Sequence, residues 1–218
     1  MNGKTFQDKW KDFRSKSKII NLMKKIAFIL FLLISIISSN VVAIEKNAET
    51  FVMETTTKAK SILLDTKLND QQKRQQLENL ALNAVDVEGL AKFTLGEEAK
   101  KLSEKQISEF VKIFKVYFSK NISSKLKDYS DQDVTVTGSK KISDIYVLVN
   151  SKITNAKDKQ EILVDWRVFL INGKLTIRDL VVEGLSLART QREEFASIIG
   201  NKGFEALIEN LKEYITKN

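Results

Sequence analysis

The spacing of the apolar residues changes from a helical to a strand period near residue 130, and this change restricts the fold more than any other feature of the chain. Before it, the apolar residues that follow Ser103 recur every three or four positions, as on one face of a helix: Ile107, Phe110, Val111, Phe114, Phe118 and Ile122. From Asp133 apolar and polar residues alternate, as they do along a strand with one buried face. The chain therefore predicts helices first and a sheet second.

Local signals indicate where these elements begin and end. Asn69 and Ser103 each stand three positions before a glutamine, which is the pattern of a helix N-terminus. Asn172-Gly173 separates two alternating runs and favours a tight hairpin, because both residues tolerate positive φ. We expect an antiparallel meander with strands near 133–137, 143–152, 160–171 and 174–183, followed by helices near 188–199 and 203–216.

An order of helices, strands and helices is typical of an α+β fold. The predicted fold is a curved antiparallel sheet of about four strands, wrapped by helices that enclose an apolar cavity. The candidate cavity residues come from one face of the sheet and from the long helix opposite it: Phe110, Phe114, Phe118, Ile145, Val147, Val149, Ile162, Val164, Trp166, Val168 and Ile177. From the residues alone, they suit either a closely packed core or a dry cavity for acyl chains, where each buried CH₂ contributes about 0.8 kcal/mol.

The chain contains no histidine and no cysteine. This excludes a Ser-His-Asp triad, an imidazole or thiolate metal site, a cysteine nucleophile and a disulfide. We therefore predict no catalytic residue, no metal and no cofactor. An enzyme on this scaffold would need a carboxylate inside the cavity near Tyr117 or Tyr146, and Asp179 is the candidate if its side chain turns inward.

The formal net charge of +8 does not indicate a nucleic-acid partner. Eight of the 36 basic residues and only two of the 28 acidic ones lie in residues 1–43, so residues 44–218 carry a net charge of only +2. This remainder lacks a basic stripe interleaved with aromatic residues. We predict that the protein does not bind nucleic acid.

Residues 1–43 resemble an export signal. Two lysines precede the apolar run Ile26–Ile37, and Val41 and Ala43 occupy the positions that signal peptidase recognises. The run is shorter than the roughly 20 residues of a membrane span. We predict a cleaved signal peptide over 1–43, in which 1–22 is an extension if Met23 is the true start, and a single domain over 44–218. The alternative is an uncleaved anchor over Ile26–Ile44.

Two arginines that follow the last strand have two interpretations. Arg189 and Arg192 are close in sequence to Asp179 and Glu183, which favours structural ion pairs where strand gives way to helix. The functional interpretation places one of them beside a lipid phosphate, since a guanidinium matches that geometry.

The segment Leu175–Phe195 resembles the hallmark of the MlaC family. In that pattern a strand ending in an aspartate leads to Glu-Gly-x-Ser and then to a helix with an arginine and an aromatic residue. Three other stretches agree in order and spacing: Asp86–Gly96, Gln106–Tyr129 and Gly203–Leu211. The chain departs from the family at Leu175, where tryptophan is usual, and from Ser119 onward, where the usual Thr-Tyr is missing.

The resemblance implies a soluble carrier in the periplasm of a Gram-negative bacterium. Its cargo would be a phospholipid with the acyl chains inside and the headgroup in solvent. Its partners would be an outer-membrane lipoprotein–porin complex and an inner-membrane ABC transporter with MCE-domain subunits, and its role would be to maintain outer-membrane lipid asymmetry. Two alternatives stay open: a membrane-anchored interaction module with a solid core, and a cone-shaped enzyme with a buried carboxylate.

Overall fold

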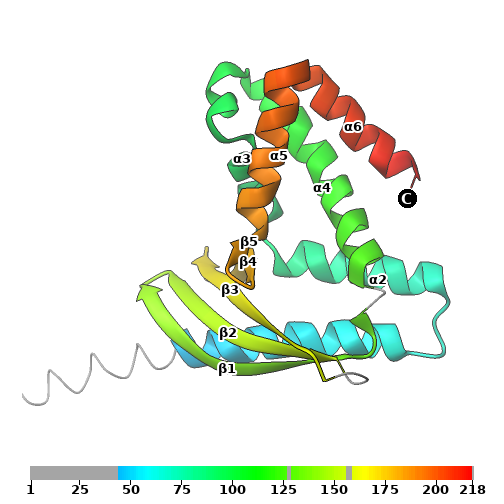
Figure 1. Cartoon of the computed structure of the whole chain (residues 1–218), viewed down its shortest axis with the longest axis vertical. Helices are drawn as coiled ribbons and strands as arrows, with labels where there is room; N and C mark the ends of the chain where they lie inside the picture. The colour runs from blue at the N-terminus through cyan, green and yellow to red at the C-terminus, as the bar shows by residue number, and fades with distance from the viewer. Residues whose placement is uncertain (1–43, 127–128, 156–158, 218) are drawn as a thin grey trace, which may run out of the picture. The chain divides into compact units, whose positions relative to one another are not determined.

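The computed structural model describes residues 44–126, 129–155 and 159–217, and residues 45–218 form one compact unit. The predicted signal peptide lies outside the described residues. The N-terminal helix covers residues 44–64. The elements that follow it are labelled in Figure 1: α2 (Asp70–Ala84), α3 (Val87–Leu95), the 3₁₀ helix η1 (Gly96–Lys101), α4 (Glu104–Leu126), β1 (Gln132–Ser143), β2 (Tyr146–Asn155), β3 (Glu161–Ile171), β4 (Lys174–Val182), β5 (Leu185–Ser186), α5 (Leu187–Lys202) and α6 (Phe204–Lys217).

The strands form one antiparallel sheet in the order β1-β2-β3-β4-β5. The predicted α+β class and the curved meander are confirmed, with the two-residue strand β5 added at the end. The hairpin at Asn172-Gly173 is also confirmed, because both residues have positive φ, 51° and 76°. The capping box at Asn69 is present as predicted, with Gln72 returning the hydrogen bond.

One face of the sheet, here called the inner face, carries the predicted apolar residues. Val147 pairs with Val168, and Val149 pairs with Trp166, so these residues point to the same side. A bulge in β4 leaves Arg178 without a partner in the ladder, and it keeps Ile177 and Leu180 on that same side.

The prediction for Ile145 was wrong. β1 continues to Ser143, and Asp144 and Ile145 form the two-residue turn to β2 rather than the start of a strand. The main-chain carbonyl of Ile145 accepts a hydrogen bond from the N–H of Leu170 at 2.8 Å, and its side chain is 54% exposed. The alternation continues through the turn by coincidence, so it could not mark where the strand begins.

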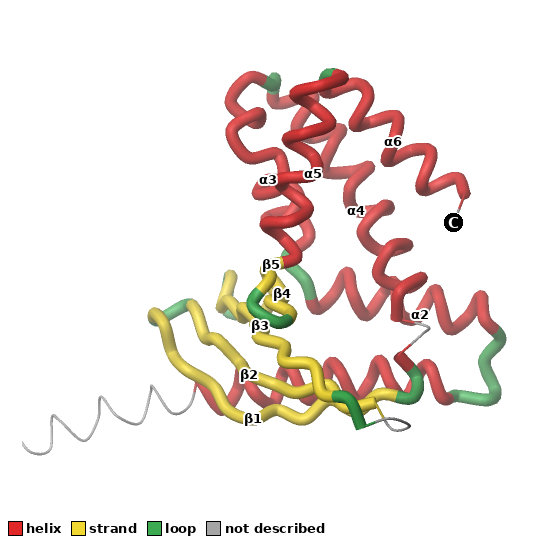
Figure 2. Tube along the Cα trace, in the orientation of Figure 1, coloured by secondary structure: helices red, strands yellow, loops and turns green. Residues whose placement is uncertain are grey.

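The N-terminal helix runs along the sheet (Figures 1 and 2). Three of its side chains bind β1 at successive levels: Glu45 accepts from the N–H of Lys141, Glu49 accepts from the hydroxyl of Ser139 at 2.8 Å, and Lys60 pairs with Asp133. We expected α4 to cover the sheet with three phenylalanines, and that arrangement was wrong. Periodicity shows that a helix has an apolar face but not which partner covers it.

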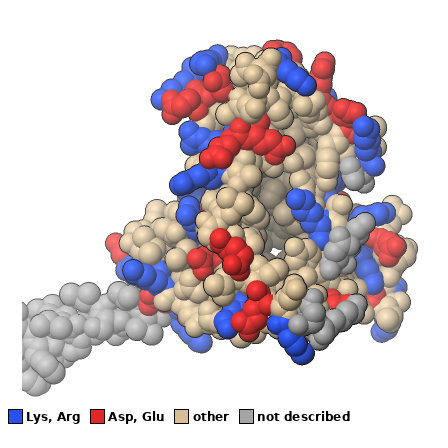
Figure 3. Space-filling model, viewed as in Figure 1, with Lys and Arg blue, Asp and Glu red and all other residues tan. Residues whose placement is uncertain are grey.

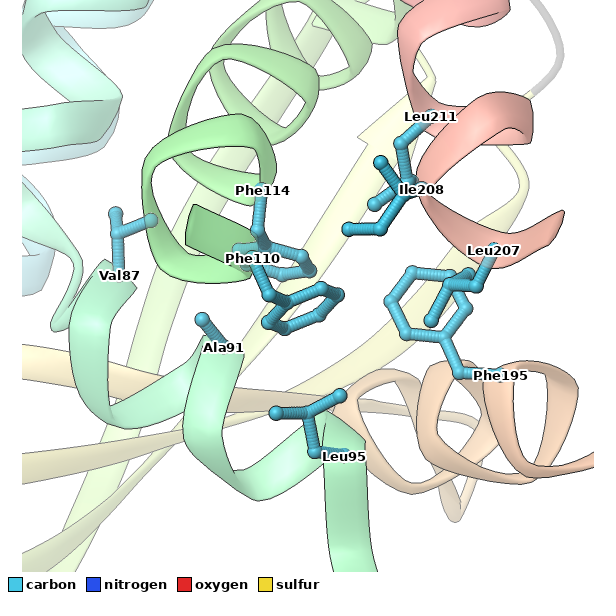
Figure 4. Packing of buried hydrophobic residues seen from close by; sticks show 9 residues of the cluster. All are labelled: Val87, Ala91, Leu95, Phe110, Phe114, Phe195, Leu207, Ile208 and Leu211. Atoms are coloured by element: carbon cyan, nitrogen blue, oxygen red, sulfur yellow. The ribbon is translucent and has the colours of Figure 1, made fainter. Parts of the chain in front are cut away.

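The phenylalanines of α4 pack among helices instead. Phe110 and Phe114 are fully buried in a cluster built from α3, α4, α5 and α6, which Figure 4 shows in detail. Phe195 of α5 stands edge-on to both rings, with centroids 6.1 Å away. The remaining buried members of this helical cluster are Val87, Ala91, Leu95, Leu207, Ile208 and Leu211. The helical cluster therefore gives the molecule a core separate from the inner face of the sheet.

Candidate functional site

A pocket of about 400 Å³ lies between the helical cluster and the inner face of the sheet. Its wall is formed by the N-terminal helix, α2, α3, α4 and α5 and by strands β3 and β4. The space-filling view in Figure 3 shows a hollow at this level, between the upper helices and the sheet. The volume falls within the range of about 300–1,000 Å³ that is usual for small-molecule sites.

α4 contributes two parallel rows of side chains to the wall. Residues four apart lie on nearly the same face of a helix, about 6 Å further along its axis. The apolar row consists of Phe114, Phe118, Ile122 and Leu126. The polar row consists of Tyr117, Asn121 and Lys125. A ligand lying along α4 therefore meets apolar surface on one side and hydrogen-bonding groups on the other.

The threonines of the wall make it less polar than its composition suggests. Each hydroxyl donates to a main-chain carbonyl three or four residues earlier in its own helix, at distances from 2.7 to 3.0 Å: Thr55, Thr56, Thr94 and Thr190. A hydroxyl bonded in this way is satisfied without a ligand. These positions therefore need no polar partner from the pocket.

Trp166 brings the sheet into the wall. Its indole N–H donates to the hydroxyl of Ser151 at 2.8 Å, and that hydroxyl donates to the carbonyl of Val164 at 3.0 Å. Both bonds lie within the sheet, so the one polar atom of the indole is satisfied there. The ring, only 9% exposed, is thereby held in one orientation as an apolar part of the wall.

Asp179 is the buried carboxylate of the wall, and its bonds are structural. It accepts hydrogen bonds from the hydroxyl of Ser186 at 2.6 Å and from the N–H of Ala188 at 3.0 Å, and Arg167 lies 3.5 Å away. Ser186 in turn caps α5 by accepting from the N–H of Arg189 at 3.1 Å. A carboxylate engaged by three donors is occupied in holding the start of α5, and this arrangement does not favour the enzyme hypothesis.

The polar row continues into α5 as a chain of hydrogen bonds. The amide of Asn121 donates to the Tyr117 hydroxyl at 2.9 Å, which donates to Gln191 at 3.3 Å, and Gln191 donates to Glu194 at 2.8 Å. Burial raises the pKa of Tyr117 above its ordinary value of 10.0, and the negative charge of Glu194 adds to the effect, although the bond from Asn121 lowers it. The tyrosine is therefore neutral at ordinary pH and offers both a donor and an acceptor.

The structure brings only part of the predicted cavity set to this pocket. Phe114, Phe118, Trp166 and Ile177 line it. Other members are buried but belong to the packed cores: Phe110, Val147, Val149, Val164 and Val168. Ile162 is half-buried on the inner face, and Ile145 is in the exposed turn. Contact of any of these residues with a ligand stays a prediction.

Sequence reasoning missed the contribution of α2, and from the polar row of α4 it named only Tyr117, as a neighbour of the cavity. Leu77, Ala81 and Ala84 are buried on α2 and line the pocket with Leu80. Their spacing of four and three is a helical signal, but two small alanines make it weak. Tyr117, Asn121 and Lys125 also repeat at intervals of four, which was visible in the sequence and is the signal that could have found them.

The two predicted arginines lie away from the pocket wall. Arg189 is exposed at the first turn of α5 and borders a separate surface depression with Arg167 and Glu193. The guanidinium of Arg192 lies over the ring of Phe93, 5.3 Å from its centroid. The expected ion pair of these arginines with Asp179 is replaced by the contact of Asp179 with Arg167.

The described residues hold no cluster of three or more acidic side chains that could bind a metal ion. None of the helices in the described ranges is long and apolar enough to cross a membrane. The alternative anchor over residues 26–44 lies almost wholly outside those ranges.

The chain thus combines an α+β fold with a largely apolar pocket between the helical cluster and the inner face of the sheet. The chain belongs to the MlaC protein family, whose match covers residues 53–213, and the predicted resemblance is confirmed. Among solved structures it is similar to the phospholipid-binding protein from Ralstonia solanacearum, solved in complex with a phospholipid. That similarity has a TM-score of 0.66 and 20% identity, and it covers 78% of this chain and 97% of the other. No curated protein matches the chain.

Proposed function

We propose that this protein binds a phospholipid and carries it through the periplasm, between an outer-membrane lipoprotein–porin complex and an inner-membrane MCE-domain ABC transporter. In this way it would maintain the lipid asymmetry of the outer membrane. The observation that carries the proposal is a largely apolar pocket of ligand size in a member of the MlaC family. The bound phospholipid of the Ralstonia structure supports the choice of cargo.

The energetics of the pocket suit acyl chains. Burying about twelve methylene groups contributes roughly 10 kcal/mol at about 0.8 kcal/mol each. That gain is comparable in size to the association cost of about 4–15 kcal/mol, so the net binding can be weak enough to be reversible. A carrier needs this balance, because it must release what it takes up.

We place the phosphate of the lipid near Lys125. This side chain belongs to the polar row, lines the pocket and is exposed in the last turn of α4. Arg178 also lines the pocket, but its guanidinium is already bonded to Asp86 at 2.8 Å. Lys125 therefore replaces Arg189 and Arg192 as the cation proposed to meet the headgroup.

Mass spectrometry of the protein purified gently from bacteria tests the cargo. We expect about one phospholipid per protein under native conditions, released on denaturation. Ala59→Trp places an indole in the pocket wall and should expel the lipid. Thr57→Trp, at an exposed position of the same helix, is the matched control and should retain it. Lipid-free wild-type protein that extracts nothing from liposomes would contradict the proposal.

Fractionation tests the location. A protein found in the soluble periplasmic fraction, with its mature N-terminus at residue 44, fits a shuttle. A protein that remains with the inner membrane and carries no lipid would instead support the anchored interaction module.

A further inference from the structure

Four side chains of the pocket wall form a single hydrogen-bonded chain, and most of the lining around them is apolar or internally bonded. The chain runs Asn121–Tyr117–Gln191–Glu194. We propose that its donors, on the first three residues, bind the ester carbonyl oxygens of the cargo, so that the protein selects ester-linked over ether-linked lipids. The inference rests on the proposed function and assigns a part of the ligand that an apolar wall cannot recognise.

The chain has donors to offer. The bond from the Tyr117 hydroxyl to Gln191 is 3.3 Å long, well above the usual 2.7–2.8 Å between hydroxyl and acceptor oxygens. A ligand acceptor can replace it at little cost. A carboxamide carries two N–H groups, so Asn121 and Gln191 each keep a second donor beyond the bond that the described structure gives them.

The negative charge of Glu194, at the end of the hydrogen-bonded chain, favours a neutral acceptor over an anionic one. Glu194 lines the pocket and accepts from Gln191 at 2.8 Å, so the chain terminates on a carboxylate. A phosphate held at Tyr117 would meet that negative charge, whereas an ester carbonyl would not. Lys125 lies two turns further along α4 from Tyr117, about 12 Å along the axis, where a phosphate finds a cation instead.

The neighbouring apolar row places the rest of the ligand. Phe118 and Ile122 lie one position after Tyr117 and Asn121 on α4, and both line the pocket. A lipid with its esters at the hydrogen-bonded chain therefore has its acyl chains beside aromatic and aliphatic surface. In this arrangement α4 contributes to the contacts of all three parts of the lipid, the acyl chain, the ester and the phosphate, and α5 shares the ester contact through Gln191.

The test compares two lipids that differ only in the carbonyl groups, with Tyr117→Phe as the variant. The full-length chain, expressed in bacteria and stripped of lipid, is offered liposomes holding equal amounts of diacyl and dialkyl phosphatidylethanolamine of the same chain length. Native mass spectrometry measures the ratio of the two bound lipids. We expect wild type to favour the diacyl lipid by roughly three- to tenfold, the value of one or two net hydrogen bonds.

Tyr117→Phe should reduce that preference to near one, because it removes the hydroxyl from the hydrogen-bonded chain. Its ring is retained, and the ring packs against Phe114, Phe195 and Tyr214. Asn121→Leu is a second variant that removes the first donor, and it should also weaken the preference. Tyr129→Phe removes the hydroxyl of an exposed tyrosine and should leave the preference unchanged.

The outcomes separate this inference from the proposed function. Equal binding of both lipids by wild type, or an unchanged preference in Tyr117→Phe, overturns the inference while the protein remains a lipid carrier. Failure of wild type to take up either lipid overturns the proposed function itself.

Discussion

Replacing Asp179 with alanine should lower the free energy of unfolding by about 3 kcal/mol, because this carboxylate joins β4 to α5. Its side chain is only 6% exposed and accepts from the Ser186 hydroxyl and from the N–H of Ala188. The alanine variant leaves that buried N–H in the first turn of α5 without its acceptor. The loss therefore falls at the junction that sets one wall of the pocket.

The magnitude follows from three contributions. An unsatisfied buried donor costs about 1–3 kcal/mol. Loss of a negative charge at a helix N-terminus adds about 0.3–1 kcal/mol. The contact with Arg167 adds less than about 1 kcal/mol, since that side chain is 39% exposed and the separation is 3.5 Å. With a urea m-value of about 2 kcal/mol/M, a total near 3 kcal/mol shifts the unfolding midpoint by about 1.5 M.

Urea unfolding, followed by circular dichroism, measures the change on protein stripped of any co-purified ligand, because a bound ligand would add its own stabilisation. Asp179→Asn keeps an acceptor for Ala188 and should lose only about 1 kcal/mol. Asp144→Ala is the control, because that carboxylate is 94% exposed, and it should leave the unfolding midpoint unchanged. A loss below about 1 kcal/mol for Asp179→Ala, or equal losses for the alanine and asparagine variants, would refute the assignment of hydrogen-bond acceptance as the main contribution.

Four further substitutions test the surrounding structure. Ser151→Ala removes the acceptor of the buried indole N–H and should cost about 1–2 kcal/mol in the same unfolding assay. Gly96→Ala should destabilise the protein by about 1–2 kcal/mol, since the φ of Gly96 is 57° and an added Cβ would lie 2.5 Å from the Arg192 guanidinium. Gly200→Ala should stabilise it by about 0.5–1 kcal/mol, because this glycine lies within α5 with open space around it. Because burial raises the pKa of Tyr117, the folded state keeps this proton more tightly than the unfolded chain. Stability should therefore fall as pH rises above about 10, and a Tyr117→Phe variant should lose less stability in that range in unfolding measured against pH.

The features that the sequence predicted correctly depend on near neighbours. The capping box at Asn69 needs only Gln72, and the hairpin at Asn172-Gly173 needs only two residues that tolerate positive φ. The pairing of Leu170 with Leu175 follows from that hairpin, because a two-residue turn sets the register of the two strands that it joins. Local chemistry therefore determined the elements and the register of β3 against β4.

The features that sequence reasoning missed depend on packing between elements that are far apart in the sequence. The inner face of the sheet and the apolar face of α4 are both real, but the N-terminal helix covers the first and α3, α5 and α6 cover much of the second. Burying an apolar face gains a similar free energy against any surface of matching shape, so the composition of the face does not predict which element covers it. The pocket results from this division of the apolar faces, because it is the space between the helical cluster and the inner face of the sheet.

The Glu-Gly-x-Ser segment of the family pattern lies outside the lining of the pocket, and it shapes the pocket by positioning α5. Glu183 and Gly184 form a turn in which both φ angles are positive, 49° and 81°, and the Glu183 carboxylate accepts from the N–H of Leu163 at 2.5 Å. The turn reverses β4 into β5, so that Ser186 reaches Asp179 and caps α5. α5 then carries Gln191 and Glu194 to the wall. A change in this turn should therefore alter lipid binding by displacing α5, even though the turn itself lies outside the pocket lining.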